Sequence, residues 1–233
     1  MRFIRNTDIE SIAEQRLADY VRKTNEVISP PVPLEKVIAQ VYGLTVLWDE
    51  IEELPDETIL GGLKPSDRII VLNQSRISLF EQKPGLERST LGHEAGHWEF
   101  DVDQASLDYP KLFDRPDMDS GQRSSGTGKV EVFAGTGCAP KFLDGLRQRD
   151  TADQERIANR FAAALSMPSK LVREAGEKFD FMQWRDLYKM AKVFEVNISA
   201  LTVRLQQLGY IYIDGNRQFH RSVAEANGQQ QLF

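Results

Sequence analysis

The sequence is poor in cysteine and in histidine. Its 233 residues include one cysteine, Cys138, and three histidines. A single cysteine cannot form an internal disulfide, so the chain does not have the composition of a small disulfide-stabilised secreted domain. The first ten residues, MRFIRNTDIE, lack the apolar core of a signal peptide. We therefore expect a cytoplasmic protein.

Long apolar runs and an excess of positive charge are also absent from the sequence. No run approaches the roughly 20 apolar residues that a membrane-spanning helix needs, so we expect no membrane association. The formal net charge is -6, which gives no general attraction to nucleic acid or anionic lipid, and direct nucleic-acid binding is not expected. With 41% hydrophobic residues, the chain is long enough for one main domain and a small subdomain.

Two helices are expected near the N-terminus. Thr7 and Glu10 have capping-box spacing and begin an apolar pattern of helical period, which predicts a helix within residues 1–30. A second, short helix begins at Pro33, a residue favoured in the first turn. Gly43 is placed where a C-cap glycine ends that helix.

Strands and then a motif-bearing helix are expected next. Residues 44–48, LTVLW, are β-prone, and residues 58–73 contain two β-prone runs around a turn. These patterns predict a small, mainly antiparallel sheet. Ser89 is a candidate cap for a helix that carries HEAGH at 93–97. The polar stretch 101–150 is expected to be a loop insertion with little regular structure.

The second half of the chain has mainly helical patterns. Thr151 and Gln154 form another capping box, ahead of an apolar stripe of helical spacing. We expect an α+β fold in which 31–175 form the main domain and 176–214 a helical, helix-turn-helix-like subdomain. Residues 215–233 are polar and rich in glutamine, so a disordered tail is expected.

The motif HEAGH carries the clearest chemistry. In a helix, residues four apart share a face, so His93 and His97 present two imidazoles to one point, as a zinc ion requires. Glu94 can reach a water at such a metal and act as the catalytic general base. Gly92 and Gly96 recur at helical spacing and leave a bare strip where another element or a substrate can approach closely.

A catalytic zinc site usually takes three protein ligands, so a third is needed. The candidates are Glu155, Asp103, Cys138 and His220. Asp103 follows His97 by six residues, as in extended zinc motifs, but Phe100 occupies the position where those motifs have a turning glycine. Glu155 is favoured because it lies in the first turn of a capped helix. Asn159 shares its face and is expected to support a ligating imidazole from outside.

The stretches LGHEAGHW (91–98) and ERIANRFAAALSMP (155–168) resemble, in this order, motifs of the ImmA/IrrE family of bacterial metallopeptidases. The similarity extends over roughly residues 31–210. It implies that residues 31–175 form a zincin-like catalytic domain with a gluzincin-like site of His93, His97 and Glu155. It also implies a zinc-dependent endopeptidase that cleaves a helix-turn-helix transcriptional repressor. Ser166 departs from the family pattern, in which leucine is usual there.

Two other functions stay open. Zinc could serve only the fold of a non-enzymatic module that binds a regulator, although such a site has no need of Glu94. Residues 187–209 have a helix-turn-helix rhythm, but Arg204 is the only basic residue in the second of the two expected helices, which favours a structural role.

The group that would stabilise the oxyanion is also open, with Tyr20, Tyr109 and Tyr188 as candidates.

Overall fold

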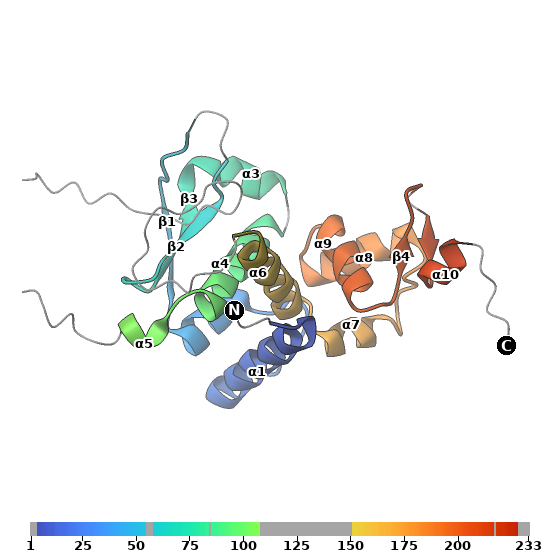
Figure 1. Ribbon diagram of the computed structural model, residues 1–233, viewed down its shortest axis with the longest axis horizontal. Helices are drawn as coiled ribbons and strands as arrows, with labels where there is room; N and C mark the ends of the chain where they lie inside the picture. The colour runs from blue at the N-terminus through green and yellow to red at the C-terminus, as the bar shows by residue number, and fades with distance from the viewer. Residues whose placement is uncertain (1–3, 55–57, 84, 108–150, 217, 228–233) are drawn as a thin grey trace, which may run out of the picture.

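The computed structural model describes residues 4–54, 58–83, 85–107, 151–216 and 218–227. These residues form an α+β fold, as the sequence predicts. Figure 1 shows two neighbouring parts. One contains the N-terminal helices, the small sheet, α4 (Leu86–Phe100) and α6 (Thr151–Ser166); the other contains the C-terminal helices and a short hairpin. Within the described residues, no helix is both long and apolar enough to cross a membrane.

The two N-terminal helices are present. They are α1 (Asn6–Thr24) and α2 (Leu34–Val37), the latter continued by the π-helical turn η1 (Ile38–Tyr42). The capping box of α1 joins Arg5 and Asp8 rather than Thr7 and Glu10, so the helix begins one to two residues earlier than predicted. Gly43 ends η1 with a φ of 64°, the left-handed conformation that a C-cap glycine adopts.

The sheet has the strand order β1-β3-β2, with β1 (Thr45–Asp49), β2 (Gly61–Lys64) and β3 (Ile69–Asn73). The predicted hairpin is β2–β3 and is antiparallel, but β1 pairs with β3 in parallel. The sheet is therefore mixed, and the expectation of a mainly antiparallel sheet is wrong. Turn residues indicate which strands form a hairpin, whereas the partner of β1 depends on how the chain crosses between β1 and β2.

Helices and short turns follow the sheet along the chain. They are the short turn η2 (Gln74–Arg76), α3 (Ile77–Gln82), α4 (Leu86–Phe100), α5 (Gln104–Leu107), α6 (Thr151–Ser166) and α7 (Ser169–Ala175). The cap of α4 is Gly85, with a φ of 83°, so Ser89 lies inside the helix and does not cap it. The short helix α5 lies at the start of the expected loop insertion; residues 108–150 of that insertion lie outside the described residues.

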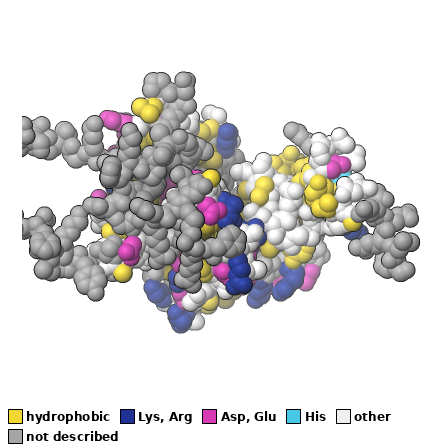
Figure 2. All heavy atoms as spheres, in the orientation of Figure 1, with side chains coloured by type: hydrophobic (Ala, Val, Ile, Leu, Met, Phe, Trp, Pro, Cys, Tyr) yellow, Lys and Arg dark blue, Asp and Glu magenta, His cyan; other side chains and the backbone are white. Residues whose placement is uncertain are grey.

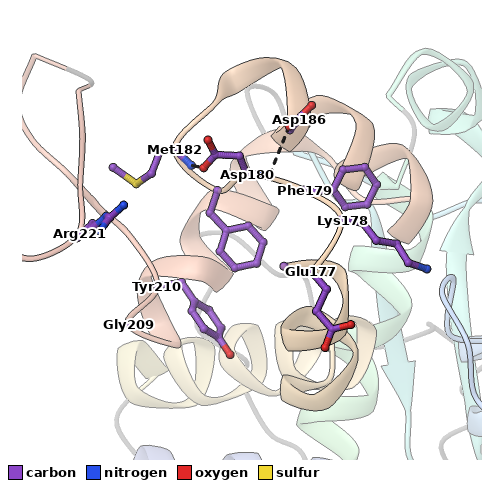
Figure 3. Close-up of a pocket in the computed structure, with 11 residues that line it drawn as sticks. Glu177, Lys178, Phe179, Asp180, Met182, Asp186, Gly209, Tyr210 and Arg221 are labelled. Carbon is purple, nitrogen blue, oxygen red and sulfur yellow. Dashed lines mark hydrogen bonds between the residues drawn. The ribbon is translucent and has the colours of Figure 1, made fainter.

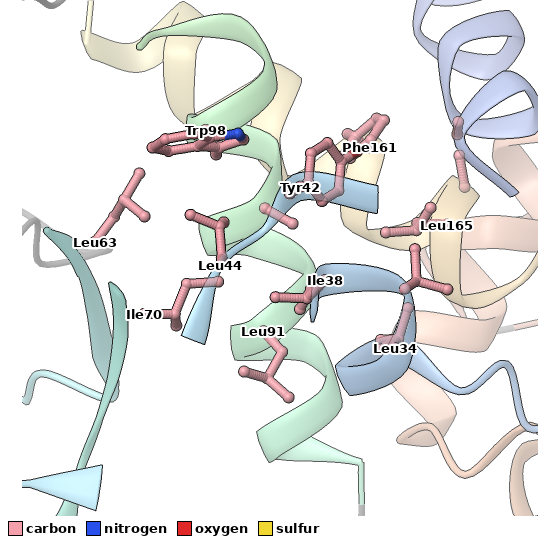
Figure 4. Packing of buried hydrophobic residues seen from close by; sticks show 14 of the residues in the cluster. Leu34, Ile38, Tyr42, Leu44, Leu63, Ile70, Leu91, Trp98, Phe161 and Leu165 are labelled. Carbon is pink, nitrogen blue, oxygen red and sulfur yellow. The ribbon is translucent and has the colours of Figure 1, made fainter. Parts of the chain in front are cut away.

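The main core lies between the sheet, α4, α6 and the N-terminal helices. Figure 4 shows Leu91 and Trp98 of α4 in this core, together with Phe161 and Leu165 of α6. These four side chains are almost completely buried. Because α4 packs one face into the core through Leu91 and Trp98, the residues between them are held in a fixed rotation about the helix axis. This rotation determines where the HEAGH side chains point.

The C-terminal part contains α8 (Trp184–Phe194), α9 (Ile198–Gln207), β4 (Tyr212–Ile213), β5 (Phe219–His220) and α10 (Val223–Ala226). The two expected helices are present, but the expectation of disorder from residue 215 is wrong up to residue 227. Strands β4 and β5 form an antiparallel hairpin, and Phe219 packs on Trp184 with ring centroids 4.4 Å apart. Figure 2 shows hydrophobic side chains gathered over this part. Residues 228–233 lie outside the described residues.

Candidate metal centre

Helices α4 and α6 run antiparallel in unusually close contact. A Cβ on Gly96 would lie 2.7 Å from Ala158 Cα, and a Cβ on Gly92 would lie 3.1 Å from Ala162 Cα. No side chain larger than hydrogen fits at Gly96 without separating the two helices. The bare strip predicted from the glycine spacing is therefore a helix contact, and it brings the face of α6 that carries Glu155 next to the two histidines.

Three possible ligands meet where these helices cross. The Nε2 atoms of His93 and His97 are 3.0 Å apart. Glu155 Oε2 is 3.3 Å from His93 Nε2, and Glu155 Oε1 is 3.4 Å from His97 Nε2. The structure thus brings together the three residues selected from the sequence as metal ligands, and this group could hold a metal ion.

The outer nitrogens of both imidazoles have acceptors beside them. His93 Nδ1 is 3.1 Å from Asn159 Oδ1, and His97 Nδ1 is 2.8 Å from Asp101 Oδ2. Because a carbonyl or carboxylate oxygen only accepts, each Nδ1 carries the proton and donates it. Each Nε2 therefore faces Glu155 and is the nitrogen that a metal would take.

Asp101 was missed by the sequence reasoning, which looked for support of an imidazole only on the helix that carries Glu155. A usable signal is present: Asp101 follows His97 by four residues and therefore shares its face at the end of the helix. Its side chain is 1% exposed. Asn159, in contrast, has the position beside an imidazole that the sequence predicts.

The charges in the cluster suit a cation. Burial alone would lower the pKa of His97, but its hydrogen bonds with Asp101 and Glu155 outweigh burial and raise that pKa. Burial would raise the pKa of Glu155, yet the hydrogen bonds with His93 and His97 lower it to about 2. The cluster therefore holds positive charge beside an ionised carboxylate. A metal would replace the proton on the imidazole.

The three groups lie close enough together to share one metal. Bonds of about 2.0–2.1 Å from zinc to nitrogen and oxygen place neighbouring ligand atoms roughly 3.3 Å apart in a tetrahedron. The two Nε2 atoms are 3.0 Å apart, and each Glu155 oxygen lies at a similar distance from a different imidazole, 3.3 Å for His93 and 3.4 Å for His97. Two imidazoles and one carboxylate also leave a fourth position open, as catalytic zinc sites require.

Glu94 is buried beside the cluster, and one of its oxygens has no hydrogen-bond partner among the described residues. The residue is 1% exposed, and the oxygen without a partner is Oε2. Burial raises the pKa of Glu94, while the charges of His93 and His97 lower it less strongly. A buried carboxylate oxygen without a hydrogen bond costs free energy. This cost is explained if Glu94 serves chemistry at the cluster.

The other candidate residues do not join the cluster. Asp103 is not part of the group that could hold a metal, and His220 lies in the C-terminal hairpin, where its Nε2 is 3.1 Å from Asp214 Oδ2. Cys138 lies outside the described residues. Among the candidate oxyanion donors, Tyr20 is buried in the core and donates to Glu26 Oε2 over 2.5 Å.

The last two candidate donors are not placed at the cluster either. Tyr188 is 54% exposed on α8 and lines a cavity beside Lys83 and Lys192. Tyr109 lies outside the described residues. The structure therefore assigns no tyrosine to this role among the residues that it describes.

A separate cavity of about 700 Å³ lies in the C-terminal part. In Figure 3, Asp180 and Asp186 lie on one side of it and Tyr210 on the opposite side. Its two aspartates have local partners: Asp186 Oδ2 accepts from the Asp180 amide over 3.3 Å, and Asp180 Oδ1 accepts from the Met182 amide over 2.9 Å. The metal cluster, beside the buried Glu94, is the stronger candidate for a functional site.

Comparison of the chain with models of protein families and with curated proteins finds no match to either. The assignment of function therefore depends on the residues of the site.

Proposed function

We propose that this protein is a zinc-dependent endopeptidase. His93, His97 and Glu155 would hold the metal, and Glu94 would act as the general base. The observation that carries this proposal is the buried carboxylate of Glu94, whose Oε2 has no hydrogen-bond partner among the described residues, beside three groups that could hold a metal. A zinc site that only stabilises a fold has no use for such a group, whereas hydrolysis needs a base at this place.

The residues divide the chemistry among them. Zinc, when bound, supplies a Lewis acid that lowers the pKa of a water and polarises the substrate carbonyl. Glu94 accepts the proton of the attacking water and later donates it to the leaving amine. Asn159 and Asp101 hold the two imidazoles in the tautomer that keeps Nε2 free.

The sheet offers a place for an extended peptide. Strand β2 lies at one edge of the three-stranded sheet, paired only with β3 among the described strands. It also packs against the helix with the HEAGH motif, since a Cβ on Gly61 would lie 2.7 Å from Thr90 Cγ2. Pairing with a free strand edge would align a substrate main chain beside α4.

The proposed substrate is a helix-turn-helix transcriptional repressor, and this part rests on the resemblance of LGHEAGHW and ERIANRFAAALSMP to the ImmA/IrrE motifs. Direct DNA binding by this chain is not proposed. Arg204, the only basic residue of α9, is fully buried and donates to both carboxylate oxygens of Glu10 and to the Met167 carbonyl. It is not available to a phosphate.

Replacement of Glu94 by glutamine tests the proposal. Glu94→Gln keeps the size of the side chain but removes the base, so cleavage of a proteome-derived peptide library should fall by at least about 100-fold. Zinc content, measured by mass spectrometry of the metal, should stay at one ion per chain. Glu81→Gln, an exposed change on α3, is the matched control and should cleave like the wild type.

Zinc-loaded Glu94→Gln protein that cleaves at the wild-type rate would refute the assignment. Wild-type protein that binds no stoichiometric transition metal would refute it as well.

A further inference from the structure

Two rows of small or polar residues lead away from the metal cluster. On α4, Ser89 lies one turn before His93, and Gly85 lies one turn before Ser89. On α6, Ala163 lies one turn after Asn159. Because the two helices are antiparallel, both rows run in the same direction, from the histidines toward the C-terminal helices.

A groove lies along these rows, with α9 as its third wall. A cavity of about 360 Å³ is lined by both rows and by α9, which Figure 1 shows beside α6. Its lining includes Asn159, the residue next to His93 Nδ1, so the cavity begins one side chain away from the candidate metal ligands. A second cavity of about 720 Å³ shares Val196, Asn197 and Ser199 with the first. We name the two together the α6–α9 groove.

The walls of the α6–α9 groove are fixed to one another. Where the two cavities adjoin, a Cβ on Gly85 would lie 2.6 Å from the Glu195 carbonyl oxygen, so the turn before α9 is in direct contact with the start of α4. Near the end of α6, Arg204 of α9 donates to Glu10 of α1 and to the Met167 carbonyl. The groove is thus formed before any ligand binds, which lowers the entropic cost of binding.

The lining of the groove changes in chemistry along its length. The cavity next to the cluster has no charged residue in its lining, which is made of alanine, serine, amide and a few apolar side chains. A charged side chain placed there would lose water without gaining a partner. The far cavity combines apolar residues such as Leu86 and Ile198 with Lys83 and Lys192. Its acidic residue, Glu195, already lies 3.9 Å from Arg88.

We propose that the α6–α9 groove binds the stretch of the protein substrate on one side of the scissile bond. It selects uncharged residues close to the bond and, further along, an apolar residue followed by an acidic one. This specificity rests on the proposed peptidase function, because the groove then receives the chain that extends from the cleaved peptide bond. The helix-turn-helix-like subdomain contributes one wall of a peptide site.

A binding and a cleavage measurement together test the groove. Zinc-loaded Glu94→Gln protein is used to select peptides from a phage-displayed random library, and wild-type protein is then assayed for cleavage of the selected peptides. Ser199→Trp places an indole at an exposed α9 position that lines both cavities. Ser11→Trp, the same change at an exposed α1 position outside both cavities, is the matched control.

The expected result is that the selected peptides have an uncharged block followed by an apolar and an acidic residue. Ser199→Trp should weaken their binding to the Glu94→Gln protein by at least about tenfold, while Ser11→Trp leaves it unchanged. Cleavage of the peptides by the wild type should fall in parallel in the Ser199→Trp variant.

The possible failures point to different conclusions. Peptides that Ser199→Trp protein binds and cleaves as well as the wild type would overturn the groove and leave the peptidase standing. Peptides that bind in a Ser199-dependent way but are not cleaved by the wild type would overturn the peptidase and keep the groove. If no peptide is bound or cleaved, both are overturned.

Discussion

Asp101 is the residue whose role the structure shows most directly. Its carboxylate lies 2.8 Å from His97 Nδ1 and is almost completely buried, so it fixes both the orientation and the tautomer of this imidazole. A hydrogen-bonding carboxylate behind a histidine also makes the opposite nitrogen a better electron donor. Asp101 would therefore act on a bound metal through His97, as a positioning residue.

Asp101→Ala should weaken zinc binding by about 10- to 100-fold, the usual effect of removing such a partner. Competition with a chromophoric chelator measures the affinity. Asp103→Ala, two residues away and outside the cluster, is the control and should bind zinc as the wild type does. Equal zinc affinity in the wild type and Asp101→Ala would show that the contact with His97 has no effect on the metal.

For individual residues, the sequence predicted the three residues of the cluster and Asn159 behind His93, but not Asp101 behind His97. His93, His97 and Glu155 follow from helical spacing, because residues four apart share a face and a capped helix fixes the register of its first turn. Asp101 could have been found by the same spacing. The burial of Glu94 could not, because it depends on side chains from other elements around α4.

At the scale of elements, the α4–α6 contact determines the site. Two histidines on one helix and a glutamate on another form a cluster only if the helices approach closely, and Gly92 and Gly96 permit this. The glycines would each weaken an isolated helix by about 1 kcal/mol relative to alanine. This local cost is offset by packing against Ala158 and Ala162.

Gly96→Ala should therefore destabilise the protein although alanine is the better helix former. The added Cβ would lie 2.7 Å from Ala158 Cα, and relieving such a contact in a packed core costs about 1–3 kcal/mol. Zinc affinity should fall too, because Glu155 moves away with α6. Chemical denaturation and zinc titration measure the two effects. Gly215→Ala, where nothing lies within 4 Å, should change neither.

A Gly96→Ala protein more stable than the wild type would mean that helix propensity outweighs the contact.

Elsewhere, the elements that local patterns specify were predicted, among them α1, α6 and the β2–β3 hairpin. The parallel pairing of β1 and the hairpin after residue 211 were not. Both depend on partners distant in the sequence, such as Trp184 beneath Phe219.

At the scale of the whole molecule, a buried ion pair joins the C-terminal helices to the domain that contains the metal cluster. Arg204 is fully buried and makes two hydrogen bonds to Glu10, 194 residues away. Arg160 Nη2 also lies 3.5 Å from a Glu10 oxygen. In the sequence, Arg204 is a basic residue on a possible DNA-reading helix. In the structure, its hydrogen bonds hold α1, α6 and α9 together. Only the tertiary structure distinguishes these roles.

The packing of the whole molecule also determines whether the fold should persist when zinc is removed. The helices that carry His93, His97 and Glu155 are held by the Gly–Ala contact and by a core that includes Leu91, Trp98 and Phe161. None of these contacts needs a metal. The protein therefore differs from small zinc domains, in which the binding of metal provides most of the folding energy.

Chelator-treated protein should consequently keep the far-ultraviolet circular dichroism of the wild type and lose its peptidase activity. Its melting temperature should be lower and should rise again with added zinc, because a ligand that binds only the folded state stabilises it by RT ln(1 + [L]/Kd). At a free zinc concentration of about 100 times Kd this amounts to about 2.7 kcal/mol. Glu155→Ala protein should show little such rise. If chelation instead unfolds the chain, zinc has the structural role of a non-enzymatic module, and the catalytic assignment of Glu94 loses its main support.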